Sequence, residues 1–323
     1  MNVLLIKLTS MGDLMHAFPA ITEASSYFPN IHFDWVVDNN FCEVPSWHPN
    51  VRNIIISNHR SWKKQFFSMS SLKELNILRS NINAEPYDLV IDMQNNIKSA
   101  FVSYLYNGDV FGMAKNSVRE YPAHWAYTKS TSISKDLHAI QRQKILMSKA
   151  LEYESNGENL NYGIDKIKFI KPKIEIPERF VVIVQNASWH TKLWSIENWR
   201  QLILYLDTLG LKSLLPSGNP QELERAKEIT RETNAIALDL MPLNEISYII
   251  NKAKFCVCSD TGLAHLSALV DTPSITLYGP TNKELIGTMG TNQYHEVGEN
   301  QKMENILLKD ITTKIELLGL TSL

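Results

Sequence analysis

Short apolar runs alternate along the first half of the chain with segments of helical periodicity. Runs typical of strands cover residues 3–8, 33–37, 53–56 and 89–91, and most are separated by stretches whose apolar residues recur every three or four positions. Strands that alternate with helices favour parallel sheets covered by helices on both faces. The pattern therefore predicts an α/β fold.

A second series of strands begins near the middle of the chain. Its members cover residues 180–184, 212–215, 235–238, 255–258 and 274–278. Between the two series, residues 164–178 contain prolines that disfavour helix and predict an extended connector. A chain of 323 residues exceeds the usual size of one core, so two domains of ~150 residues are expected. We place them at residues 1–165 and 166–323.

The first candidate for chemistry is the turn after the first predicted strand. Residues 9–14 read Thr-Ser-Met-Gly-Asp-Leu and lead into a periodic segment that ends near Phe28. Asp13 then lies in a first helical turn at the carboxyl end of a sheet, where ligands bind in open α/β folds. A carboxylate there is well placed to act as a general base. The alternative is a favourable pairing of an acid with the helix dipole.

The second candidate is the turn at residues 259–262, which read Ser-Asp-Thr-Gly between an apolar strand and a predicted helix. A helix N-terminus offers unpaired N–H groups to a phosphate, and Gly262 has no Cβ to keep the ligand away. The alternative is that Asp260 or Thr261 only caps the helix and that His265 is a partly buried histidine with satisfied hydrogen bonds.

Composition narrows the class of protein. Hydrophobic residues make up 44% of the chain, charged residues 20%, and the net charge is −2, which is typical of a soluble globular protein and unsuited to binding nucleic acid. Three cysteines cannot form a disulfide framework.

The chain opens on a strand, without a basic and apolar leader, and no run approaches the ~20 apolar residues of a membrane span. A cytoplasmic location is expected, and a periplasmic binding protein is disfavoured. The lack of a Gly-x-Gly-x-x-Gly fingerprint disfavours a nicotinamide enzyme.

Five motifs are spread over nearly the full length of the chain: residues 7–13 (KLTSMGD), 45–48 (PSWH), 192–194 (KLW) with 199–200 (WR), 259–265 (SDTGLAH) and 277–281 (LYGPT). Together, and in this order, they resemble the motifs of the lipopolysaccharide heptosyltransferases of glycosyltransferase family 9, above all the heptosyltransferase I group. The resemblance implies the glycosyltransferase B architecture, in which two doubly wound Rossmann-like domains face each other across a cleft. It also suggests that a helix at residues 303–318 returns to the first domain.

The resemblance implies an ADP-heptose site in the second domain. Lys192 and the hydroxyl of Ser188 would bind the phosphates, although relatives often have two hydroxyl residues where this chain has Ala187 and Ser188. Glu222 would hold the ribose, and Met241 would lie near the adenine. A first-turn acid is also common for dipole reasons, and a methionine can simply fill the core. The turn contributes the remaining donor-binding residues, Asp260, Thr261, Gly262 and His265.

The resemblance places the acceptor, Kdo-lipid A, on the first domain. Arg60, Lys63, Lys64 and Arg119 match basic positions of the family, and the acceptor's carboxylate and phosphates require cations. The first three could equally form an ordinary exposed patch. Neighbouring aromatic residues, Trp62, Phe66 and Phe67, suggest transient contact with the cytoplasmic face of the inner membrane.

The implied activity is an inverting, single-displacement transfer of heptose to Kdo with Asp13 as the base. We expect no cofactor and no bound metal, because Lys192 and a helix N-terminus can neutralise a diphosphate. Three alternatives remain open: a heptosyltransferase with a later core acceptor, an enzyme for another nucleotide sugar, and a non-catalytic two-lobed binding protein for sugar nucleotides. Acceptor competition assays would separate the two enzymatic alternatives. Measured turnover of the donor would exclude the non-catalytic binding protein.

Overall fold

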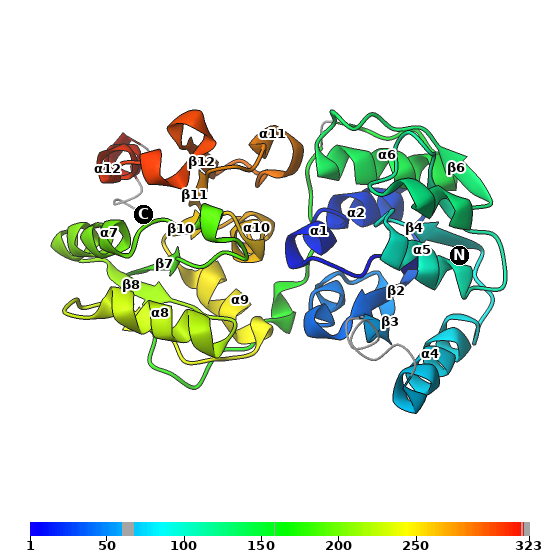
Figure 1. Cartoon of the computed structure of the whole chain (residues 1–323), viewed down its shortest axis with the longest axis horizontal. Coiled ribbons are helices and arrows are strands. Elements are labelled where there is room, and N and C mark those ends of the chain that lie inside the picture. Colours follow the sequence, from blue (N-terminus) through cyan, green and yellow to red (C-terminus); the bar gives the residue numbers. More distant parts are fainter. Residues whose placement is uncertain (60–67, 158, 318, 320–323) are drawn as a thin grey trace. The chain divides into compact units, whose positions relative to one another are not determined.

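The computed structural model describes residues 1–59, 68–157, 159–317 and 319. The chain divides into two compact units, Met1–Asp165 and Lys166–Leu323. Each unit contains one six-stranded sheet with the connecting helices packed on it (Figure 1). In both sheets, every pair of neighbouring strands is parallel. The α/β prediction is therefore confirmed.

The first unit has the strand order β3-β2-β1-β4-β5-β6. Leu4 and Ile6 of β1 face α4 and α5 in one core cluster, while on the opposite face of the sheet Trp35 of β2 meets Phe18 of α2 edge to face. Helices α2 and α6 pack against each other. The elements are β1 Asn2–Ile6, α1 Met11–Met15, α2 Phe18–Tyr27, β2 His32–Asp38, β3 Val51–Ser57, α4 Met69–Ile82, β4 Leu89–Asp92, α5 Ile97–Tyr104, β5 Phe111–Met113, η3 Tyr121–Ala126, β6 Lys129–Thr131 and α6 Ala139–Leu151.

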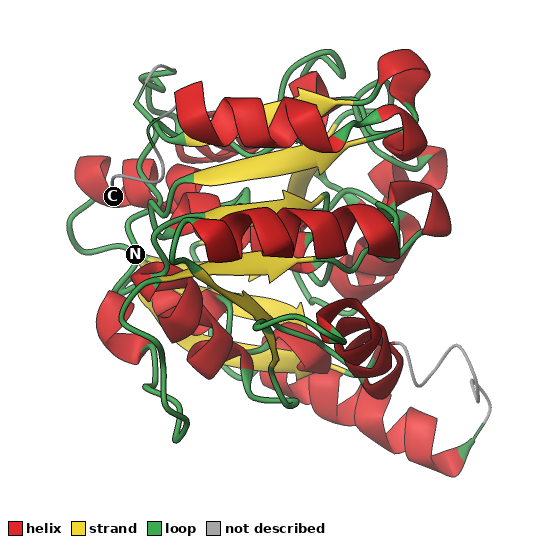
Figure 2. Ribbon diagram, turned by 90° about the vertical axis from the view of Figure 1, so that its left-hand side faces the viewer, coloured by secondary structure: helices red, strands yellow, loops and turns green. Residues whose placement is uncertain are grey.

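The second unit has the strand order β12-β11-β10-β7-β8-β9, and Figure 2 shows helices packed in front of strands and running roughly alongside them. Its elements are β7 Phe180–Val184, η5 His190–Lys192, α7 Ile196–Thr208, β8 Lys212–Leu215, α8 Pro220–Thr230, β9 Ile236–Ala237, α9 Leu243–Lys252, β10 Cys256–Ser259, α10 Gly262–Leu269, β11 Ser274–Tyr278, α11 Lys283–Ile286, β12 Gln293–Val297 and α12 Leu308–Leu317.

The last helix packs within the second unit. Helix α12 packs on α7, and its Ile311 and Ile315 are buried in the core of the second unit together with Trp199. The apolar residues of α12 recur at a helical spacing, so one face of the helix supplies this contact. These contacts make α12 part of the core of the second unit.

The strands that the sequence pattern missed are β5, β6 and β12. β5 and β6 have three residues each, and β12 reads Gln-Tyr-His-Glu-Val. Runs this short or this polar lack the apolar signal that marks a buried strand. The other strands agree with the prediction to within a few residues.

The periodic segment after Gly12 is two helices, where the sequence predicted one. Pro19 lies in the first turn of α2, and a proline has no N–H to bond to the carbonyl four residues earlier. Helix α1 therefore ends at Met15, and the carboxylate of Asp13 lies on a helix of a single turn.

Gly163 lies near the end of the first unit, and its backbone is left-handed, with φ +62°. A Cβ at this position would collide with the Thr22 hydroxyl, which bonds to His48 Nε2 at 3.0 Å. We expect Gly163→Ala to lower the free energy of unfolding by about 2–4 kcal/mol, from left-handed strain plus overpacking.

Gly210→Ala is the matched control. Gly210 also has a positive φ, +70°, but a Cβ there meets no described atom within 4 Å, so only about 1–2 kcal/mol of strain is expected. Urea unfolding measures both variants. Equal losses would show that the Thr22–His48 contact does not constrain Gly163.

Candidate functional site

Asp13 lies in the single turn of α1, at the carboxyl end of β1. Its Oδ2 accepts hydrogen bonds from the backbone N and the hydroxyl of Ser10, both at 3.1 Å. Arg119 Nη1 lies 3.5 Å from the same oxygen, and the Arg119 side chain is 62% exposed. The structure thus brings two predicted site residues together, an acid and a cation that solvent can reach.

The charges around Asp13 keep its carboxylate ionised. Burial alone would raise the pKa of Asp13, but the charge of Lys7, the hydrogen bonds from Ser10 and the charge of Arg119 outweigh burial and hold that pKa below its usual value. Burial lowers the pKa of Lys7 to about 8 despite the nearby carboxylates of Asp13 and Asp92. Lys7 is therefore still mostly protonated at pH 7.

A polar cluster after β4 holds the segment that carries Arg119. The Asn95 carbonyl accepts from the Arg119 backbone N at 2.9 Å, and the Asn95 side-chain oxygen accepts from Met113 N at 2.7 Å. Asp92 accepts from the backbone N of Asn95 at 2.9 Å and from the Tyr127 hydroxyl at 2.8 Å. These bonds fix the position of Arg119 near the end of β1.

The second unit has its own charged cluster, at the carboxyl ends of β10 and β11. Asp260 Oδ2 accepts from Lys192 Nζ at 2.6 Å and from the Thr281 hydroxyl at 2.5 Å. Asp260 is buried, and Lys192 is partly exposed. A buried carboxylate needs such partners. The ion pair holds the lysine ammonium at the mouth of the turn before α10.

The turn into α10 has the geometry of a capped helix. Thr261 is the N-cap, with extended backbone, and its hydroxyl accepts from Leu263 N at 3.2 Å. Gly262 is the first helical residue, and His265 is buried in the first turn. Both the capping and the anion-binding interpretations fit this arrangement, since a capped helix keeps its dipole and its first N–H groups.

The remaining predicted donor residues lie on loops along the same edge of the sheet. Ser188 is exposed in the loop after β7, and Met241 precedes α9. Glu222 lies in the first turn of α8, where its two carboxylate oxygens accept from Gly218 N and from Asn219 Nδ2, both at 2.8 Å. Glu222 therefore shapes its own loop, as the first-turn alternative expects.

Three predicted acceptor residues, Arg60, Lys63 and Lys64, lie outside the described residues, as do Trp62, Phe66 and Phe67.

The sequence pattern missed four residues that build these clusters, Lys7, Asp92, Asn95 and Thr281, and also the buried Gln185 that follows β7. A polar run directly after a strand, residues 92–96 and 185–186, is the signal that could have identified three of them. Gln185 is buried, and neither of its amide atoms bonds to a protein atom among the described residues. Lys7 sits within an apolar strand pattern and gives no such signal.

Within the described ranges, no group of three or more His, Cys, Asp or Glu side chains is arranged to hold a metal ion. Cys256 and Cys258 are buried in β10 with free thiols, which confirms their interpretation as core residues. None of the helices in the described part of the chain has the length and apolar character to cross a bilayer.

A protein-family model described as glycosyltransferase family 9 (heptosyltransferase) matches residues 76–315. This chain belongs to that family. Lipopolysaccharide heptosyltransferase 1 of Salmonella typhimurium is 37% identical to this family 9 chain, over 98% of the chain and 100% of the relative.

Solved structures agree with the family assignment. The Escherichia coli heptosyltransferase WaaC with ADP has a TM-score of 0.91 and 35% identity to this family 9 chain, covering 98% of it and 100% of WaaC. The same enzyme with ADP-2-deoxy-2-fluoro heptose gives a TM-score of 0.90 at 35% identity, over 98% and 99% of the two chains. The predicted glycosyltransferase B fold is thereby confirmed.

Replacing Arg119 with Met should raise the pKa of Asp13, because it removes a positive charge 3.5 Å from the carboxylate. Carboxyl ¹³C chemical shifts followed through a pH titration measure this pKa directly. Arg119→Lys is the matched control, because it keeps a cation and should move the pKa less. An unchanged pKa in Arg119→Met would mean that Lys7 and Ser10 alone set the charge of Asp13.

Proposed function

We propose that this chain transfers heptose from ADP-heptose to Kdo of the lipopolysaccharide inner core, with inversion at the anomeric carbon. The observation that carries the proposal is the Lys192–Asp260 pair, 2.6 Å apart, at the N-terminus of α10. Lys192 supplies a cation beside the backbone N–H groups at the α10 N-terminus. A diphosphate leaving group requires both kinds of donor. The names of the family 9 relatives contain heptose, ADP and lipopolysaccharide, and the choice of Kdo as the acceptor rests on the resemblance of the sequence motifs.

In this proposal the second unit binds the donor. Lys192 keeps two N–H donors for the phosphates while the third bonds to Asp260, and Ser188 and the backbone at Thr261 and Gly262 add neutral donors. Glu222 accepts one bond on each carboxylate oxygen, which leaves lone pairs for the ribose hydroxyls. Met241 lies against the adenine, and His265 lies near the sugar or the phosphates.

The first unit binds the acceptor. The exposed guanidinium of Arg119 offers paired donors for the carboxylate of Kdo, and its contact with Asp13 would bring the acceptor hydroxyl next to the base. Arg60, Lys63 and Lys64 would bind the acceptor's other anionic groups. The acceptor is a lipid, so we also propose that the enzyme works peripherally at the cytoplasmic face of the inner membrane.

The chemistry is one displacement. The Asp13 carboxylate takes the proton of the acceptor hydroxyl, and that oxygen forms a bond to the anomeric carbon as the bond from carbon to the β-phosphate oxygen breaks. The electron pair leaves with ADP, whose new charge Lys192 and the α10 N-terminus stabilise. A low pKa suits Asp13 here, because the carboxylate must be ionised before the proton transfer begins.

The decisive experiment measures ADP release by the purified protein from ADP-heptose, with and without Kdo-lipid A, in the presence of a metal chelator. We expect release that depends on the acceptor and survives chelation. Tight binding of ADP-heptose without release would instead favour a later acceptor or a non-catalytic binding protein.

Asp13→Asn should lower kcat by about 10²–10⁴-fold, the usual contribution of a general base, and should leave ADP affinity unchanged. Glu197→Gln is the matched control, since Glu197 is also a first-turn acid, on α7, and should leave both quantities unchanged. Steady-state kinetics and calorimetry measure these effects. Loss of ADP binding together with kcat would show that Asp13 has a structural role.

Lys192→Met should weaken ADP binding about 10–100-fold, because a charged hydrogen bond contributes about 1.5–3 kcal/mol. Lys227→Met is the control, because Lys227 is exposed and paired with Glu224 on α8. The double variant Lys192→Met/Asp260→Asn leaves no unpaired buried carboxylate, so it separates binding from misfolding. Wild-type ADP affinity in a folded Lys192→Met protein would refute the donor site.

A further inference from the structure

Helix α5 exposes an apolar stripe. Ile97, Phe101 and Tyr104 follow the i, i+4, i+7 spacing of one helix face, and all three are exposed, Tyr104 by 81%. The opposite face of α5 is buried against the sheet through Val102. A surface helix normally presents polar residues to solvent, so the outward face of α5 has the character of a contact surface.

The short helix η3 extends this stripe with two more aromatic residues. Tyr121 and Trp125 are exposed, Trp125 by 72%, and their ring centroids lie 6.1 Å apart. Helices η3 and α5 pack against each other, and Glu120 accepts from Ile97 N at 2.8 Å. We call this surface the α5–η3 patch; it consists of Ile97, Phe101, Tyr104, Tyr121 and Trp125.

The α5–η3 patch is bordered by cations. Lys98 is exposed beside the stripe, and Lys115 Nζ lies 5.2 Å from the centroid of the Tyr121 ring. The nearby carboxylate of Glu120 is engaged with the backbone of Ile97. Amphipathic aromatic rings flanked by lysines are the composition that binds the headgroup region of an anionic bilayer.

The α5–η3 patch is also continuous with the site around Asp13. Arg119 lies two residues before η3 and contacts Asp13 at 3.5 Å. Its backbone is held by Asn95, which directly precedes the N-cap of α5. A catalytic carboxylate that acts on a lipid-anchored sugar has to work close to the membrane surface. Arg119 joins Asp13 to the segment that leads into η3, so docking through the α5–η3 patch would hold Asp13 near the membrane.

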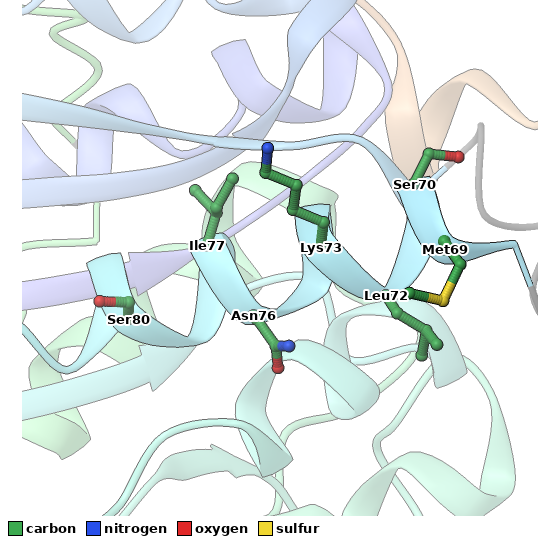
Figure 3. A pocket seen from close by; sticks show the side chains of 7 residues that line it. All are labelled: Met69, Ser70, Leu72, Lys73, Asn76, Ile77 and Ser80. Carbon is green, nitrogen blue, oxygen red and sulfur yellow. The ribbon is translucent and has the colours of Figure 1, made fainter.

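From these observations we infer that the α5–η3 patch docks the enzyme on an anionic bilayer surface. The inference rests on the proposed function, because that function supplies the lipid-anchored acceptor. Helix α4 also leaves apolar surface at Met69, Leu72 and Ile77 (Figure 3). In the sequence this helix follows closely after residues 60–67, which the structure does not describe. We therefore base no inference on the apolar surface of α4.

The test measures cosedimentation with vesicles of phosphatidylethanolamine containing phosphatidylglycerol. Tyr104→Ser/Trp125→Ser should lower partitioning at least about tenfold, because two aromatic side chains leave the interface. Tyr27→Ser is the matched control: Tyr27 is an exposed aromatic residue at the end of α2, on the other face of the sheet, and its variant should bind as the wild type does. Lys98→Glu/Lys115→Glu should weaken binding to anionic vesicles, leave binding to purely zwitterionic ones unchanged, and keep the apolar surface intact.

Activity on two acceptors distinguishes this inference from the proposed function. On a water-soluble, deacylated Kdo acceptor, the aromatic double variant should keep the wild-type kcat/KM; on vesicle-embedded Kdo-lipid A, its KM should rise. A wild-type enzyme inactive on both acceptors would refute the proposed function. The docking surface would be refuted if the folded double variant bound vesicles as well as the wild type does. It would also be refuted if the substitutions changed only the oligomeric state of the protein, as measured by sedimentation velocity.

Discussion

Parallel strand pairing is the constraint on which both units depend. Because every paired strand runs the same way, all the loops that leave the carboxyl ends emerge at one edge of each sheet. In the first unit that edge gathers Asp13 and the Asp92–Asn95 cluster, and in the second it gathers Lys192 and Asp260. The central strands β1, β4, β7 and β10 are largely apolar and buried, so the charged groups of both sites gather at that edge.

Burial makes the polar residues at these edges depend on one another. Asp92 is held by backbone N–H groups and a tyrosine hydroxyl, and Asp260 is held by a lysine and a threonine. Removing one partner from such a group leaves a desolvated charge, which destabilises more than the lost bond alone suggests. Binding residues and folding residues therefore overlap at both sites, and matched controls are needed to separate the two roles.

The sequence predicted the turns better than the contacts between them. Strand, glycine and helix signals lie within a dozen residues of each other, so the loops that carry Asp13 and Asp260 could be found from local pattern. The bond between Lys192 and Asp260 spans 68 positions, and the anchoring of Arg119 by Asn95 joins two loops; neither leaves a local signal. The strands β5, β6 and β12 were missed because their residues are few or polar.

The outermost strands of the two sheets have a consequence for association between molecules. At one end of the first sheet, Arg52 of β3 bridges Asp34 and Glu85; at the other end, β6 begins with an exposed lysine. The second sheet ends on the two-residue β9 and on β12, whose Glu296 pairs with Lys314. Charged or very short border strands are poor templates for a strand from another chain. We therefore expect that substitutions which remove these charges would promote aggregation of the protein through strand pairing between molecules.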